Sequence, residues 1–344
     1  MPLSETDVRA ALREVKYPGF SRDIVSFGLV KSVNIDNGEV KVQLALATND
    51  PAVPQTIKTD TEKVLLAIAG VQSAKVLIDI HAPPAGAGVG AMQLPGIRHV
   101  IAVASGKGGV GKSTVAANLA VALDQAKARV GLCDCDIYGP SISLMFGTRE
   151  RPMATEENRI VPVEQYNLKL MSMGFLLDDT SPAILRGPMV TRYTQQFLRQ
   201  VEWGELDYLV LDLPPGTGDI QLTIVQTVAL SGAIIVTTPQ EVALIDARKA
   251  ATMFEKVNVP VLGLIENMSY FISPSDGKRY DIFGSGGGER EAKRLRVPLL
   301  GQIPIDIATR EAGDRGMPIV AEDRQSPVTA EFDKIARRIQ EALA

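Results

Sequence analysis

The sequence predicts two domains, a small α+β domain followed by a doubly wound α/β domain with a mostly parallel sheet. Three observations support this prediction. The chain has 344 residues, 45% hydrophobic and 22% charged, which suits two globular domains. After residue 97, short apolar runs recur, most of them separated by a stretch long enough for a helix. Between the two regions, residues 82–97 are rich in glycine, proline and alanine and are expected to form a linker.

Composition and charge argue against several classes of protein. The formal net charge is -4 and aromatic residues make up 5% of the chain, so neither a basic surface nor a stacking platform for nucleic acid is expected. No apolar stretch approaches the roughly 18 residues that cross a membrane, and the first residues show no signal peptide. The two cysteines indicate no disulfide framework. We therefore expect a cytoplasmic protein that binds neither nucleic acid nor a membrane.

The N-terminal domain is predicted to span residues 1–81. Ser4 has the character of a helix N-cap, with Asp7 at the position of a capping-box acid. Asn37-Gly38 accepts the positive φ of a hairpin turn and separates two strand-like runs. The predicted elements are a helix, two strands, a helix and a strand, over residues 4–15, 24–35, 38–46, 55–68 and 74–80.

The second domain is predicted to span residues 98–344. Its apolar runs are expected to be strands of a buried parallel sheet with helices on both faces. These runs occupy residues 99–105, 128–135, 207–213, 232–238, 259–267 and 297–303. The last predicted helix, residues 328–343, carries Phe332, Ile335 and Ile339 on one face. Its acids and bases balance, so we expect it to dock on the domain rather than on anionic lipid.

A glycine-rich loop after the first of these strands is the strongest functional signal. It fits G-x-x-x-x-G-K-[ST] and leads into a helix; its residues are Gly106, Lys107, Gly108, Gly109, Val110, Gly111, Lys112, Ser113 and Thr114. The glycines let consecutive backbone N–H groups converge on phosphate oxygens, aided by the helix N-terminus. Lys112 is predicted to bind the β- and γ-phosphates of a nucleotide, and Ser113 to ligate Mg²⁺.

Two aspartates are expected at the same edge of the sheet, where ligands bind in α/β folds. Asp136 closes the sequence Asp134-Cys135-Asp136 after the second strand. Asp212 ends the apolar run 207–213, which fits an acid that holds Mg²⁺ through water. The glycines at 216 and 218 follow in a loop that is expected to move when the γ-phosphate leaves.

Lys107 gives the loop the form K-G-G-x-G-K-[ST], and the sequence resembles the deviant-Walker ATPases, which include MinD and ParA. The resemblance implies that Lys107 reaches the nucleotide of a partner subunit, as an arginine finger does. It also implies that Asp136 positions the attacking water or holds Mg²⁺ through water. Asn267 would read adenine, and Pro304 would pack against the base. The expected catalytic residues are Lys107, Lys112, Asp136 and Asp212.

Further stretches resemble the Mrp/ApbC branch of these ATPases, a family of Fe–S cluster carriers. They lie at residues 136–141, 186–189, 212–219, 266–271 and 282–288, and the resemblance covers essentially residues 99–344. Residues 18–25 are similar to the signature turn of the small domain often fused ahead of Mrp proteins. The resemblance implies a homodimer that binds and hydrolyses ATP with Mg²⁺. It further implies Fe–S cluster transfer to apoprotein clients, or work with Fe–S assembly proteins.

The usual cluster ligands of this branch are missing. Where cluster-carrying relatives have C-x-x-C, this chain has Ser273-Pro274-Ser275-Asp276, which supplies no thiolate. Cys133 and Cys135 are expected to be buried core residues, while a ligand role of Cys135 stays open. His81 and His99 are expected to be structural. The sequence therefore leaves the Fe–S ligands unknown.

Three function hypotheses follow. The first is an Mrp-type ATPase that carries or assembles Fe–S clusters. The second is a nucleotide-switched positioning or adaptor ATPase of the MinD/ParA kind, without a cluster. In the third, the protein is a regulatory subunit whose N-terminal domain recruits clients.

Overall fold

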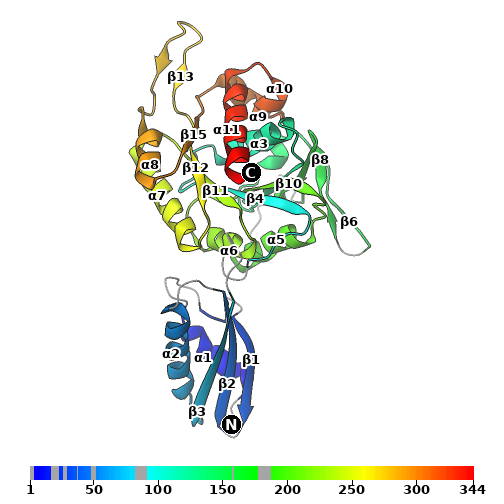
Figure 1. Cartoon of the computed structure of the whole chain (residues 1–344). Coiled ribbons are helices and arrows are strands. Elements are labelled where there is room, and N and C mark those ends of the chain that lie inside the picture. The colour runs from blue at the N-terminus through cyan, green and yellow to red at the C-terminus, as the bar shows by residue number, and fades with distance from the viewer. Residues whose placement is uncertain are drawn as a thin grey trace. The chain divides into compact units, whose positions relative to one another are not determined.

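The computed structural model describes residues 4–16, 23–25, 29–36, 38–47, 52–81, 91–156, 159–176 and 187–344. The chain divides into two compact units, Met1–Gly90 and Ala91–Ala344 (Figure 1). Outside the described residues lie most of the predicted linker, most of the signature turn, Asn37, Arg186 and the side chain of His81. No helix in the described ranges is long and apolar enough to cross a membrane.

The N-terminal unit is a three-stranded sheet with strand order β1-β2-β3, packed against two helices (Figure 1). Ser4 Oγ accepts the N–H of Asp7, whose carboxylate accepts the N–H of Ser4, so the predicted capping box is confirmed. The sheet is antiparallel between β1 and β2 and parallel between β2 and β3. The elements are α1 (Glu5–Ala11), η1 (Leu12–Glu14), β1 (Val30–Asp36), β2 (Glu39–Ala47), α2 (Ala52–Leu66) and β3 (Ser73–His81).

The C-terminal unit is built on an eight-stranded sheet with strand order β15-β12-β11-β4-β10-β5-β9-β8. Every neighbouring pair is parallel except β9 and β8, so the predicted mostly parallel sheet is confirmed. The strands are β4 (Ile97–Ala104), β5 (Val130–Asp134), β8 (Val163–Gln165), β9 (Leu168–Met171), β10 (Leu206–Asp212), β11 (Gly232–Thr237), β12 (Val261–Glu266) and β15 (Leu299–Gln302). Sequence reasoning identified six of these strands and missed the short β8 and β9.

Helices cover both faces of this sheet (Figure 1). On β11, Ile234 packs into a core shared with α3 and α11, whereas the next residue, Ile235, packs against α7. Phe332, Ile335 and Ile339 of the last helix are fully buried, so its predicted docking on the domain is confirmed. The helices are α3 (Lys112–Gln125), α4 (Ile142–Met145), η2 (Met173–Phe175), α5 (Gly187–Gln200), α6 (Asp219–Thr227), α7 (Glu241–Lys256), α8 (Gly287–Leu295), α9 (Ile307–Asp314), α10 (Ile319–Glu322) and α11 (Pro327–Leu343).

Two small hairpins extend from the unit. One pairs β6 (Met153–Ala154) with β7 (Ile160–Val161), and the other pairs β13 (Phe271–Ile272) with β14 (Arg279–Tyr280). Neither hairpin is predicted by the sequence, because two-residue strands leave no apolar alternation to recognise.

Candidate functional site

The glycine-rich loop joins β4 to the N-terminus of α3 at the carboxyl edge of the sheet. Gly109 and Gly111 have φ of 80° and 78°, a conformation that side chains other than glycine rarely adopt. A Cβ atom at Gly111 would lie 2.2 Å from Nδ2 of Asn267. A Cβ atom at Gly106 would lie 2.1 Å from the carbonyl oxygen of Asp246 in α7. The loop is therefore a tight backbone cradle that only glycine can complete at these positions.

A buried ion pair lies beside this cradle. Lys112 Nζ donates to Oδ1 of Asp212, which ends β10, and also lies 3.3 Å from Oγ of Ser113. Lys112 is 6% exposed and Asp212 is fully buried. Burial raises the pKa of Asp212, while the ammonium of Lys112 and the hydroxyl of Ser113 act in the opposite direction. The second carboxylate oxygen, Oδ2, has no hydrogen-bond partner among the described residues. A buried oxygen without a partner fits a position for water or a cation.

Asp134 ends the neighbouring strand β5 and is almost completely buried. Its Oδ1 accepts the N–H of Asp136 at 3.0 Å. Its Oδ2 accepts the N–H groups of Ser141 at 3.1 Å and Ile142 at 3.3 Å, and the hydroxyl of Ser172 at 3.0 Å. The carboxylate thus joins the two ends of the loop that carries Asp136.

Asp136 lies in that loop, half-buried, where its Oδ1 accepts the N–H of Gly139 at 3.2 Å. Its charge is close enough to Asp212 to favour the protonated form of that carboxyl. Burial and the charge of Asp212 raise the pKa of Asp134 to about 7. The structure therefore gathers Lys112, Asp136 and Asp212 at one sheet edge, as the sequence predicts.

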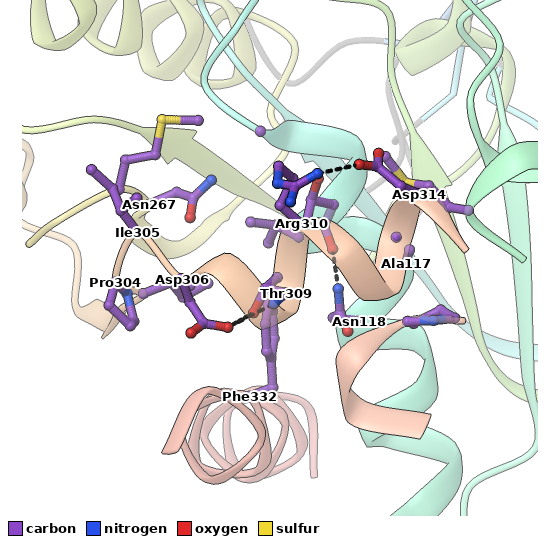
Figure 2. A pocket seen from close by; sticks show the side chains of 18 of the residues that line it. Ala117, Asn118, Asn267, Pro304, Ile305, Asp306, Thr309, Arg310, Asp314 and Phe332 are labelled. Carbon is purple, nitrogen blue, oxygen red and sulfur yellow. Dashed lines mark hydrogen bonds and ion pairs between the residues drawn. The ribbon is translucent and has the colours of Figure 1, made fainter. Parts of the chain in front are cut away.

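A cavity of about 440 Å³ opens beside the loop (Figure 2). Asn267, after β12, and Pro304, after β15, both line it, at the two positions that the resemblance assigns to base recognition. Asn267 Nδ2 donates to the carbonyl oxygen of Val110 at 2.8 Å, which ties this side of the cavity to the phosphate loop. The cavity is mainly apolar with a few polar groups, as small-molecule sites usually are.

Sequence reasoning missed several residues around this cavity. Asp306 caps α9 by accepting the N–H of Thr309 at 2.7 Å, and Arg310 pairs with Asp314 at 2.8 Å (Figure 2). Asn118, in the apolar helix α3, accepts the N–H of Val320 at 3.1 Å. For Asn118, the sequence offered one signal, a single asparagine within an apolar helical stretch. For Asp306 and Arg310 it offered none, because no recognisable motif precedes α9.

Lys107 lies half-buried in the phosphate loop. Its backbone carbonyl accepts the hydroxyl of Ser105 at 2.9 Å, which holds the loop at this residue. Within the described ranges, its ammonium group makes no hydrogen bond or ion pair. This charge is therefore available to another group.

The two cysteines, Cys133 in β5 and Cys135 just after it, are fully buried, with their Sγ atoms 3.9 Å apart. The neighbouring Cys133 thiol and burial raise the pKa of Cys135 well above its ordinary value, which disfavours the thiolate that binds metals. His99 stacks on Tyr208 with ring centroids 5.3 Å apart. Among the described residues, no three His, Cys, Asp or Glu side chains are grouped to hold a metal ion.

Ser273 and Asp276 lie in the turn of the β13–β14 hairpin. Asp276 accepts the N–H of Lys278 at 3.0 Å and the hydroxyl of Tyr280 at 2.9 Å. The hydroxyls of Ser273 and Ser275 lie 2.8 Å apart. The turn is thus closed by hydrogen bonds at the positions where the resemblance places cluster ligands.

The mostly parallel sheet, the glycine-rich loop with its second lysine, and the acids Asp136 and Asp212 at the carboxyl ends of neighbouring strands define a P-loop NTPase. The family described as "NUBPL iron-transfer P-loop NTPase" matches residues 96–340. The family described as "Iron-sulfur cluster assembly protein" matches residues 5–78. The chain belongs to the NUBPL iron-transfer P-loop NTPase family and carries an N-terminal domain of the iron-sulfur cluster assembly family.

Individual relatives agree with this assignment. An iron-sulfur cluster carrier protein from Synechocystis sp. is 44% identical over 344 residues, covering 98% of this chain and 97% of that protein. The iron-sulfur cluster transfer protein NUBPL of Mus musculus is 49% identical over 253 residues, covering 73% and 79%. A solved nucleotide-binding protein from Archaeoglobus fulgidus, in complex with ADP, is 40% identical, with a TM-score of 0.61 over 70% of this chain and 94% of that one. The cell division ATPase MinD of Pyrococcus furiosus is 25% identical, with a TM-score of 0.56 over 71% and 99%.

Proposed function

We propose that this protein binds and slowly hydrolyses Mg·ATP as a homodimer, and that it carries Fe–S clusters to apoprotein clients. One observation carries the nucleotide part: the buried Lys112–Asp212 pair lies beside a glycine cradle, and Asp212 retains an unpartnered oxygen within the described structure. The cargo part is supported by the names of the relatives, which are carriers and transfer proteins of iron-sulfur clusters.

The residues of the cradle would hold the phosphates. The loop N–H groups and the N-terminus of α3 favour negative charge. Lys112 would exchange its carboxylate partner for phosphate oxygens, and this exchange would release Asp212. The oxygen donors present fit Mg²⁺, with Ser113 as a direct ligand and Asp136 and Asp212 acting through water. The ion supplies charge neutralisation, and Asp136 would orient the attacking water.

Lys107 would act between subunits. Its ammonium group has no partner within the described ranges, and a charge held on the phosphate loop can stabilise a phosphoryl-transfer transition state in a facing subunit. Asn267 and Pro304 would recognise adenine, because both line the cavity beside the loop and the asparagine amide can accept from the base amine. If Lys107 of each subunit acts on the nucleotide of the other, and Asn267 and Pro304 of each subunit bind the adenine of its own nucleotide, the dimer holds two nucleotides at its interface.

The hydrolysis proposal is tested by phosphate release from Mg·ATP. Lys112→Ala and Asp136→Ala should lower kcat by at least on the order of 10²-fold, because catalysis here depends on positioned charges. Lys107→Ala should lower kcat and also reduce the ATP-dependent dimer seen by light scattering. Lys278→Ala, at an exposed hairpin lysine, is the control and should keep the wild-type rate. A wild-type rate in any of the three site variants would contradict the assignment.

A second function remains a candidate, a nucleotide-switched positioning or adaptor ATPase without a cluster. The hairpin turn favours it, because Ser273 and Asp276 are engaged in hydrogen bonds and the two cysteines are buried.

Anaerobic reconstitution with iron and sulfide separates the two functions. A stable cluster per dimer, with transfer to an apoferredoxin, supports the carrier. No cluster with intact ATPase activity supports the adaptor. A Cys133→Ser/Cys135→Ser variant tests the ligand role that the sequence left open for Cys135.

A further inference from the structure

We propose that Asp134 is a positioning residue: its carboxylate fastens the loop of residues 135–142 and thereby holds Asp136 at the nucleotide. The inference rests on the proposed ATP hydrolysis and adds a residue to which neither the motif nor the family resemblance gave a role. It is carried by hydrogen bonds from three separate places in the fold.

The two oxygens of Asp134 hold opposite ends of the loop. Oδ1 accepts the N–H of Asp136, at the start of the loop. Oδ2 accepts the N–H groups of Ser141 and Ile142, where the loop enters α4. One side chain therefore closes the segment that carries Asp136, and residues 135–141 of that segment form no strand or helix.

The third attachment comes from the far side of β5. Ser172, fully buried after β9, donates its hydroxyl to Oδ2 of Asp134 and accepts the N–H of Gly174 at 3.0 Å. A Cβ atom at Gly174 would lie 2.3 Å from Oγ of Ser143 in α4. The loop, α4 and η2 are thus packed as one unit, with the Asp134 carboxylate at its centre.

Asp134 differs from the two other acids of the site in what its oxygens do. Asp212 pairs with Lys112 and leaves one oxygen without a partner in the described structure, whereas both oxygens of Asp134 accept protein donors. Asp134 is only 1% exposed. Its geometry therefore suits it to orient the backbone of its neighbours and not to hold water or a phosphate itself.

Asp134→Asn tests this role, because the amide preserves the shape but replaces one accepting oxygen by an N–H₂ group, which cannot accept the hydrogen bonds that this oxygen now accepts. Hydrogen–deuterium exchange of residues 135–142 should speed up, with α3 amides unchanged. In the full-length protein, kcat should fall on the order of 10- to 100-fold, as expected for a misplaced reacting group. The Kd of a non-hydrolysable ATP analogue should change by less than about threefold, because the phosphate cradle is untouched.

Ser172→Ala provides a milder variant that removes one of the four hydrogen bonds. It should lower kcat several-fold with the same unchanged Kd. In the Asp134→Asn background it should add less than about twofold, because residues that act through one unit are not additive. Asp323→Asn is the matched control, since this exposed aspartate also accepts a backbone N–H, from Gln325 at 2.9 Å. It should leave exchange and kcat unchanged.

Wild-type exchange of residues 135–142 in Asp134→Asn would overturn the proposal. A large loss of ATP-analogue affinity at unchanged kcat would also overturn it, since Asp134 would then act on binding. If the Asp134→Asn protein fails to fold, Ser172→Ala and its exchange decide the question. The exchange experiment needs no turnover, so it remains decisive even if the wild-type protein proves not to hydrolyse ATP.

Discussion

Gly111 ends the phosphate-binding loop in a left-handed conformation and lies directly against Asn267. Gly111→Ala should lower the free energy of unfolding by about 1–3 kcal/mol, because the methyl group meets both a strained φ and the Asn267 amide. It should also abolish binding of a fluorescent ATP analogue. Denaturant unfolding without nucleotide measures the first effect. Gly108→Ala is the control, since a Cβ there meets nothing within 4 Å, and its unfolding should be near wild type. Equal unfolding of the two variants would contradict the geometry.

Lys112 is expected to contribute to the stability of the protein besides its proposed role in catalysis. Lys112→Ala removes the cation beside the fully buried Asp212 carboxylate and should cost on the order of 3 kcal/mol of stability, because a buried charge is left uncompensated. Asp212→Asn in the same chain should recover most of that loss, since the amide carries no charge. Thermal unfolding of the two single variants and the double variant measures the coupling. Additive losses would show that the pair does not interact.

The positions of some of these site residues could be predicted from the sequence, whereas the contacts of others could not. Lys107, Lys112 and Asp212 stand in short patterns whose spacing is tied to a particular backbone conformation, so their position at one sheet edge could be predicted correctly. Asp134 lies two residues before Asp136, yet its partner Ser172 is 38 positions away. A contact of that kind depends on which strands lie side by side, and no local pattern encodes it.

Helices α7 and α8 are joined by one ion pair with a buried acid. Arg248 donates to both oxygens of Glu291 at 2.8 and 2.7 Å, and Glu291 is 2% exposed. Arg248→Met should lower the free energy of unfolding by about 2 kcal/mol, because the methionine keeps the packing and leaves a buried carboxylate unpaired. Lys293→Met removes the exposed pair of the same helix with Glu289 and should change nothing measurable. Equal effects in a urea titration would contradict this prediction.

Prediction of the elements followed their hydrophobic pattern. The six predicted strands and the last helix were recognisable because burial on both faces leaves a continuous apolar run, and docking on one face leaves a helical period. The edge strand β8, its neighbour β9 and the two hairpins were not recognised, because their few residues lie outside any such run and depend on their pairing partners. The capping box at Ser4 was predicted from two residues alone, since both of its hydrogen bonds lie within one helical turn.

The division of the chain into two compact units bears on how its function is distributed. The phosphate loop, the three aspartates and the cavity lined by Asn267 and Pro304 all lie within Ala91–Ala344. A chain that begins at residue 91 should therefore bind an ATP analogue with a Kd within about twofold of the full-length value, since no site residue is removed. Isothermal titration measures this. Keeping Met92 matters, because its N–H donates to the carbonyl oxygen of Thr227 at 2.9 Å. A large loss of affinity would assign the N-terminal unit a part in nucleotide binding.

The β13–β14 hairpin turn, closed by Asp276 and the paired serine hydroxyls, has a wider consequence. Its shape is specified by oxygen and nitrogen atoms of the chain itself, so folding of this turn requires neither iron nor sulfide. Residues 273–280 contain no cysteine or methionine, so molecular oxygen, which destroys exposed clusters and oxidises thiols, has no sulfur atom to oxidise there. The turn should therefore keep one conformation in aerated, iron-starved medium and in anaerobic, iron-replete medium alike.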